Sequence, residues 1–321
     1  MRSESPVSPP FYRKKADSLL LHYSNIADLG RPHLETTCTS TRCLPVTKYK
    51  IMARFDGKSL KGLIGGIVTK TDKNGKIIYQ SKAEHVNQSK GTKVASGIFG
   101  QASALAKIIR ANLSYITNEN HDTGMVNRFN TPFRDIMRQS FDKTTQTYSF
   151  SEDSFDRLAG FEFNVNSLLI NHLLVKPTMK LEGLEVKVNI PEINIATQLK
   201  FAGGTNFCTL IVGSTQVALH KRRVKQFEYQ TIDITSSPNA VIPAQEFTFT
   251  AAEGCLVTVG IGLHFYSLYN NIKTVYNSTA CSPANVIGAV VTPGTFVEPP
   301  QRVEGNTTYA SPWSLAVNLK I

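Results

Sequence analysis

Residues 184–190, LEVKVNI, alternate apolar and polar side chains until Pro191 ends the pattern. Successive side chains of a β-strand point to opposite faces of a sheet, so a period of two predicts a strand with one buried face. The same alternation occurs at residues 161–165, FEFNV, which we also expect to form a strand. These two stretches mark the point where the chain becomes rich in β-structure.

Further β-prone runs follow, separated by Gly, Asn, Ser and Pro residues that favour turns. They span residues 207–219, 224–235, 246–250, 255–269, 273–276, 286–291 and 314–321. Many short strands without a long helix between them are typical of a β-sandwich. We therefore predict an immunoglobulin-like β-sandwich domain over residues 155–321.

Upstream of this domain, two β-prone runs, 63–71 and 76–82, flank the sequence Asp72-Lys-Asn-Gly75. Asn-Gly is a strong hairpin signal because both residues tolerate positive φ angles. We therefore predict a β-hairpin formed by these two runs.

Two helices are expected after the hairpin. The apolar residues of 91–113 recur at steps of three and four, which predicts an amphipathic helix: Val94, Ile98, Ala102, Leu105, Ile109 and Leu113. A strip of small residues on this helix, Gly97, Gly100 and Ala104, suits either core packing or an assembly interface. Thr131 and Pro132 have the character of an N-cap and first helical residue, so the second helix is expected to begin there.

The predicted fold is thus α+β and mainly β: an N-terminal β-hairpin with two helices at 52–150, followed by the sandwich. Residues 1–51 contain Ser/Pro clusters and lack a sustained period. We interpret them as either a disordered tail or a spurious upstream extension, with Met52 as the true start. Detection of any peptide from this segment by mass spectrometry of the native protein would contradict the second interpretation.

Positive charge is concentrated in the first half of the chain. The net charge is +11, and residues 52–110 carry eleven Lys/Arg against three Asp/Glu, a net of +8, whereas residues 161–321 carry eleven against ten, a net of +1. Such asymmetry indicates a polyanion or an acidic surface as partner, although basic residues also protect sheet edges and confer solubility. The candidate polyanion-binding residues are Lys58, Lys61, Lys70, Lys73, Lys76 and Lys82, with Lys221, Arg222 and Arg223 in a later loop.

Motifs for catalysis are missing from the sequence: it contains no His-Glu-x-x-His and no Gly-x-Ser-x-Gly, and its five cysteines follow no zinc or disulfide spacing. We therefore expect a non-enzymatic protein without cofactor or metal. No apolar stretch is long enough for a membrane helix or a signal peptide, so we expect a cytoplasmic protein that does not insert into membranes.

Several stretches resemble small basic proteins of Bacteroidota in which a Gly-rich hairpin and a helix precede a β-sandwich. They are KGLIGGIVTK (61–70), NGK (74–76), TKVASGIFGQASALAKIIR (92–110), FEFNVNS (161–167), LEVKVNIPEI (184–193) and LHFYSLYNNIKTVYNS (263–278). The resemblance covers residues 52–291. It implies the fold given above and assigns no activity or binding residue.

The sequence therefore favours a non-catalytic structural or interaction protein that acts through a protein partner or self-assembly. The alternative is a nucleic-acid-binding protein that uses the basic segment 54–110, although aromatic residues for base stacking are sparse there.

Overall fold

The computed structural model describes residues 52–321 except positions 56, 58, 73, 85, 86, 238, 300, 301, 305, 306 and 310. The interpretation of residues 1–51 therefore lies outside the described part of the chain. Two compact units divide after residue 85. The β-strands before this point are called the N-terminal sheet, and the residues after it are called the main unit.

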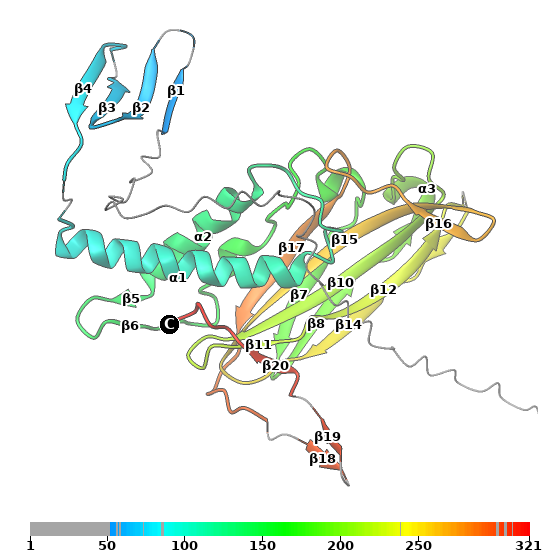
Figure 1. The fold of residues 1–321 in the computed structure, drawn as a ribbon. Helices are drawn as coiled ribbons and strands as arrows, with labels where there is room; N and C mark the ends of the chain where they lie inside the picture. Colours follow the sequence, from blue (N-terminus) through cyan, green and yellow to red (C-terminus); the bar gives the residue numbers. More distant parts are fainter. Residues whose placement is uncertain are drawn as a thin grey trace, which may run out of the picture. The chain divides into compact units, whose positions relative to one another are not determined.

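The N-terminal sheet is a four-stranded antiparallel meander in the order β1-β2-β3-β4 (Figure 1). Its strands are β1 (Met52–Phe55), β2 (Leu60–Ile64), β3 (Ile67–Thr71) and β4 (Ile77–Ser81). β3 and β4 pair across the Asn-Gly sequence, where the Asp72 carboxylate accepts hydrogen bonds from the backbone N–H groups of Asn74 and Lys76.

The prediction of one strand at 63–71 was wrong, because Gly65 and Gly66 interrupt it. Ile64 pairs directly with Ile67, so the two glycines form a two-residue turn between β2 and β3. Gly65 has a φ of 57°, which glycine adopts without a steric penalty. Gly-Gly between apolar runs is itself a hairpin signal, so the sequence contained the information.

The main unit is built on a large antiparallel sheet whose two longest strands, β10 (Phe207–Ala218) and β15 (Cys255–Tyr269), pair along the whole of β10. β12 (Glu228–Thr235) and β11 (Arg223–Lys225) pair with the free side of β10, so the predicted run 224–235 is two strands. The remaining members are β16 (Ile272–Val275), β17 (Ala284–Val291) and β20 (Trp313–Leu315).

One face of the large sheet is covered by a three-stranded sheet of β7 (Thr178–Glu182), β8 (Glu185–Ile190) and β14 (Gln245–Thr250), in the order β14-β8-β7. The alternating stretch 184–190 behaves as predicted: Val186, Val188 and Ile190 are buried in one cluster with β10 and β15. Residues 161–165 do not form the expected strand. Only a single bridge, between Glu162 and Asn285, links them to β17.

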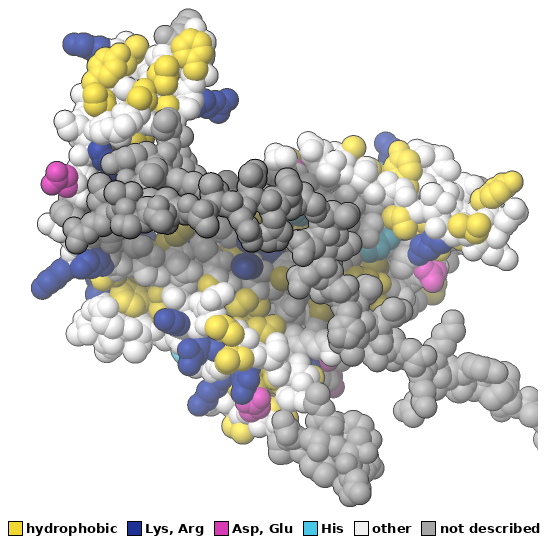
Figure 2. Space-filling view, viewed as in Figure 1, with side chains coloured by type: hydrophobic (Ala, Val, Ile, Leu, Met, Phe, Trp, Pro, Cys, Tyr) yellow, Lys and Arg dark blue, Asp and Glu magenta, His cyan; other side chains and the backbone are white. Residues whose placement is uncertain are grey.

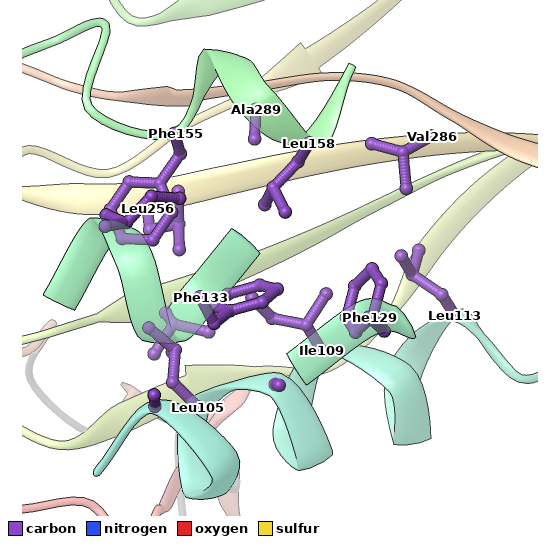
Figure 3. Packing of buried hydrophobic residues seen from close by; sticks show 14 of the residues in the cluster. Leu105, Ile109, Leu113, Phe129, Phe133, Phe155, Leu158, Leu256, Val286 and Ala289 are labelled. Atoms are coloured by element: carbon purple, nitrogen blue, oxygen red, sulfur yellow. The ribbon is translucent and has the colours of Figure 1, made fainter. Parts of the chain in front are cut away.

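Two helices, α1 (Lys90–Leu113) and α2 (Met125–Gln139), cover the opposite face of the large sheet. Figure 3 shows Leu105 and Ile109 of α1 and Phe133 of α2 together with Leu256 and Val286 of the sheet. The main unit therefore has three layers: helices, large sheet and small sheet. The minor elements are β5 (Phe141–Asp142), β6 (Thr147–Tyr148), η1 (Asp156–Leu158), η2 (Leu169–Asn171), β9 (Ile193–Asn194), α3 (Ile195–Gln198), β13 (Val241–Ile242), β18 (Arg302–Glu304) and β19 (Thr307–Tyr309).

These layers bear out an α+β, mainly β fold, but an immunoglobulin-like sandwich is not confirmed. Because α1 and α2 share a core with the large sheet, the compact units separate after residue 85 and not at the expected boundary between 150 and 155. Among the helices of the described residues, none is long and apolar enough to cross a membrane.

The expected start of the second helix was also wrong, since α2 begins at Met125 and contains Thr131 and Pro132 in its interior. The Asp122 side chain accepts a hydrogen bond from the Gly124 N–H at 2.8 Å and pairs with Arg128 one turn into the helix. Burial opposes ionisation of Asp122, but hydrogen bonds from Val165, Arg128 and Gly124 outweigh it and lower the pKa of the carboxyl. This anchored turn starts the helix despite the proline further along.

The end of α1 lies against β15 where that strand has no side chains. Gly260 and Gly262 face Ile116, which follows the helix, and His264 Nε2 hydrogen-bonds the Ile116 carbonyl oxygen at 2.9 Å. Burial lowers the pKa of His264, so its neutral form donates this bond. The two glycines thus allow the helix layer to approach the sheet closely.

Candidate interaction surfaces

A groove of about 620 Å³ lies in the main unit, formed by the first half of α1, the end of α2 and the β5–β6 hairpin. Val94, Ala95, Ile98 and Phe99 of α1 supply its apolar floor together with Phe141 of β5. The Phe99 side chain is 53% exposed, which is unusual for an aromatic residue on the helix that covers the core.

The floor follows from the periodicity of α1. Further along the helix, Ala102, Leu105 and Ile109 are fully buried against α2 and the large sheet. Towards the N-terminus the apolar stripe continues through Val94 and Ile98, which are only half-buried, and Ile98 packs at the edge of the core. The apolar stripe of α1 is therefore longer than the surface that α2 and the sheet provide for it.

Cationic side chains surround this apolar floor. Lys90, Arg134, Arg138 and Lys143 line the groove. Arg134 is partly neutralised by the adjacent Asp135, at 3.0 Å. Lys90, Arg138 and Lys143 form no ion pair with any other residue that the structure describes.

The charge at the start of α1 opposes the helix dipole. Lys90 and Lys93 occupy the first turn, which contains no acidic residue. The N-terminal end of a helix carries partial positive charge and is stabilised by anions, so lysines there are unfavourable by a few tenths of a kcal/mol each. The Ser89 side chain caps one backbone N–H, that of Thr92, at 3.1 Å. An anionic partner in the groove would compensate this concentration of positive charge.

The third wall of the groove is held rigidly by its own turn. The Asp142 carboxylate accepts hydrogen bonds from the Thr144 N–H at 2.7 Å and the Thr145 hydroxyl at 2.9 Å. These bonds lower the pKa of Asp142, so the carboxylate stays ionised and the turn stays formed at neutral pH. Phe141 packs at a tilt against Tyr148, with ring centroids 5.0 Å apart, which fixes its position in the floor.

A second charged surface lies on the N-terminal sheet. Strand register places Arg54 opposite Lys61, and Lys61 on the same face as Lys70 of the next strand. Cations side by side on neighbouring strands form a basic surface that attracts anions. Of the predicted polyanion-binding residues, Lys61 and Lys70 are therefore brought together, and Arg54 joins them although it was not among the predicted residues.

The other predicted residues are dispersed. Lys76 follows the Asn-Gly turn and Lys82 follows β4, both exposed, whereas Lys58 and Lys73 fall outside the described residues. Lys221 and Arg222 lie in the main unit, in the turn between β10 and β11, and Arg223 begins β11. Arg223 forms an ion pair there with Glu298 at 2.8 Å.

One thiol–imidazole pair lies in the main unit. Cys281 Sγ is 4.0 Å from His172 Nε2, and the other ring nitrogen of His172 is 3.0 Å from the Lys200 carbonyl oxygen. Burial raises the pKa of the Cys281 thiol, so the reactive thiolate is disfavoured at neutral pH. Within the described residues, no group of three or more His, Cys, Asp or Glu side chains could hold a metal ion.

The groove was not predicted from the sequence, because its walls come from three separate segments. Arg134 and Arg138 are visible in the sequence as cations one helical turn apart, but that spacing is also ordinary for a solvated helix face. The stronger signal was the absence of any acidic residue in the first turn of the helix at 91–113.

Comparisons of this chain with protein-family models, with curated proteins and with solved structures find no match.

Proposed function

We propose that this chain is a non-catalytic interaction protein that binds an acidic, amphipathic helical segment of a protein partner in the groove of the main unit. The observation that carries the proposal is the combination of an apolar floor with Lys90, Arg138 and Lys143 at its rim. An amphipathic helix would place its apolar side chains on Ile98, Phe99 and Phe141, and its carboxylates against the rim.

A binding function fits the chemistry of the described residues better than catalysis does. The protonated state favoured for Cys281 argues against a nucleophilic thiol. The groove itself is lined by apolar and cationic side chains and Gln146, with no carboxylate or histidine to act as a general base. Electrostatic attraction at the rim would instead accelerate association and select acidic partners.

The test is the binding of a fluorescently labelled, Leu- and Glu-rich amphipathic helical peptide to the full chain, followed by anisotropy. The variant Arg138→Glu/Lys143→Glu reverses two rim charges and is expected to weaken binding at least tenfold, because carboxylates would then meet carboxylates. Raising the salt concentration should weaken binding to the unmodified chain more than binding to this variant.

The matched control is Lys221→Glu/Arg222→Glu, which makes the same change in net charge at an exposed turn of the same unit. It is expected to leave the affinity within about twofold. Equal weakening by both variants would show that the change in net charge alone lowers the affinity, and it would contradict peptide binding in the groove. Absence of peptide binding by the unmodified chain at low salt would also contradict the proposal.

Nucleic-acid binding is a second candidate function, favoured by the row formed by Arg54, Lys61 and Lys70. This row would place three positive charges beside the backbone phosphates of DNA. Because each neutralised phosphate releases counterions, the logarithm of the affinity should fall linearly with the logarithm of the salt concentration.

For this candidate, the expected result is that Arg54→Gln/Lys61→Gln/Lys70→Gln lowers the salt dependence of duplex DNA binding, by a slope of about 0.9 for each phosphate that the variant no longer neutralises. A control with Lys176→Gln/Lys180→Gln/Lys200→Gln removes the same charge from the main unit and should keep the slope. A chain that binds no DNA at low salt, or equal slopes for the two variants, would contradict nucleic-acid binding by this row.

A further inference from the structure

Strand β12 forms an open edge of the large sheet. It pairs with β10 over all eight of its residues, without a bulge, and no residue that the structure describes pairs with its other side. Figure 1 shows β12 at the margin of this sheet. An unpaired edge of such length presents a row of backbone N–H and C=O groups, which is a template for a further strand.

The register identifies the backbone groups that point outwards. The Ser236 N–H donates to the Asn206 carbonyl oxygen at 2.7 Å, which continues the ladder between β10 and β12. In an antiparallel ladder, alternate residues direct both of their backbone groups to the same side. The even-numbered residues of β12 therefore bond to β10. The odd-numbered residues direct their N–H and C=O groups away from it, and we call them the free-edge residues: Tyr229, Thr231, Asp233 and Thr235.

Two other edge strands of the main unit are closed. The edge of β17 is covered by residues 152–163, which form four backbone hydrogen bonds of 2.8–3.1 Å with it. On β14, the carbonyl oxygens of Thr248 and Thr250 accept hydrogen bonds from the side-chain amides of Gln230 and Gln216, at 3.0 Å and 2.8 Å. Cover, Lys and Pro are the usual protection of a sheet edge, and β12 has none of them. Its edge is therefore suited to pairing with a partner.

The core side of β12 favours an apolar residue on the incoming strand. Ile232 is only half-buried, although Ile234, the next residue on this face, is 2% exposed. An apolar side chain on a strand beside β12 would cover Ile232 and extend the core. Because side chains alternate between the faces of a sheet, every second residue of that strand should be apolar.

The opposite face of β12 favours a cation on the incoming strand. The Asp233 carboxylate accepts a hydrogen bond from the Thr209 hydroxyl at 2.7 Å and forms no ion pair with any described residue. Figure 2 shows Lys and Arg side chains gathered near β11 and β20, at the other end of β10. A Lys or Arg opposite Asp233 would form a favourable cross-strand pair, whereas a second copy of β12 contains no cation.

We infer that β12 binds an extended segment of a protein partner in which β-branched apolar residues alternate with Lys or Arg, and that this segment adds a strand to the large sheet. Hydrogen bonds to the free-edge residues would supply affinity, and the alternating side chains would supply specificity. This inference is independent of the groove, because no residue of β12 lines it.

The test is the binding of a fluorescently labelled peptide that alternates Val and Lys, and is as long as β12, to the full chain. The variant Thr231→Pro removes one outward N–H group and keeps the ladder with β10, since proline is tolerated where an edge N–H faces solvent. It is expected to weaken binding about tenfold, because a peptide carbonyl would lose its donor. A peptide with Glu in place of Lys should bind more weakly, because its carboxylates would meet Asp233.

The matched control is Thr248→Pro, the same substitution on the edge strand β14. The Thr248 carbonyl oxygen bonds to Gln230 and so points away from β8, which means that its N–H does too and that the ladder between β14 and β8 is kept. This variant is expected to leave the affinity within about twofold. Equal weakening by the two proline variants would overturn the inference, as would failure of the unmodified chain to bind the Val/Lys peptide.

Hydrogen exchange keeps the inference testable if Thr231→Pro perturbs β12. In the unmodified chain, the peptide should slow exchange of the amides of the free-edge residues, which the ladder with β10 leaves unprotected. Exchange that the peptide does not change would overturn the inference. Protection that rises with the concentration of the chain, without peptide, would identify a second copy as the occupant and would overturn it as well.

Discussion

Replacing Gly262 by alanine is expected to destabilise the main unit by more than about 2 kcal/mol. A Cβ atom at this position would lie 2.5 Å from the Ile116 carbonyl oxygen and 2.7 Å from Ile116 Cγ2. One of these contacts is to backbone, so a rotamer change cannot relieve it, and the segment after α1 would have to move away from β15. Such overpacking typically costs about 1–3 kcal/mol, and loss of the His264 hydrogen bond to the same carbonyl would add to it.

The measurement is urea unfolding followed by the fluorescence of Trp313, the only tryptophan in the chain. Its side chain is buried in the main unit, with the ring centroid 4.5 Å from that of Phe296, so the signal reports on this unit. Gly97→Ala is the control: no atom lies within 4 Å of the new methyl group, and alanine stabilises a helix by about 1 kcal/mol relative to glycine. If Gly262→Ala were as stable as Gly97→Ala, the close approach of helix and sheet would be incorrect.

The largest single effect is expected for Phe129→Ala, at about 3–5 kcal/mol of unfolding free energy. Phe129 is fully buried on α2, and its ring centroid lies 5.0 Å from that of Phe133 and 4.8 Å from that of Phe161. Removing the ring would leave a cavity between the helix layer and the segment that follows η1, where the well-packed neighbours cannot collapse fully. Urea unfolding, followed by Trp313 fluorescence, again measures the change in unfolding free energy.

Phe99→Ala removes the same ring from α1 and provides the contrast. Because Phe99 is 53% exposed, its loss should change the stability by less than about 1 kcal/mol. The same variant should weaken peptide binding in the groove, so the two phenylalanines separate stability from binding. If Phe99→Ala destabilised the unit as much as Phe129→Ala does, the aromatic floor of the groove would be part of the core.

The candidate surfaces were predictable to different degrees. The basic row could be predicted once Gly65-Gly66 is recognised as a two-residue turn. The turn fixes the register of β2 and β3, and this register places Lys61 and Lys70 on the same face. The groove could not be derived in this way. Its floor and rim bring residues 90–99 together with residues 134–146. The distance in space between these two segments depends on how α1 and α2 pack, which no local sequence pattern reveals.

Periodic stretches of the sequence were sufficient to predict some single elements. A period of two at 184–190 predicted β8 and its buried face, and a period of three to four predicted α1 within one residue at its start. These patterns arise from backbone geometry and the burial of one face, which act over a few residues.

Which layers meet became visible only in the folded structure. β10 and β15 are buried on both faces, so their side chains show no alternation that could reveal the helix layer above them. Glycine is unfavourable in a strand, yet Gly260 and Gly262 are the positions where Ile116, beyond α1, contacts the sheet. Contacts of this kind depend on shape at long sequence separation, and a one-dimensional pattern does not record shape.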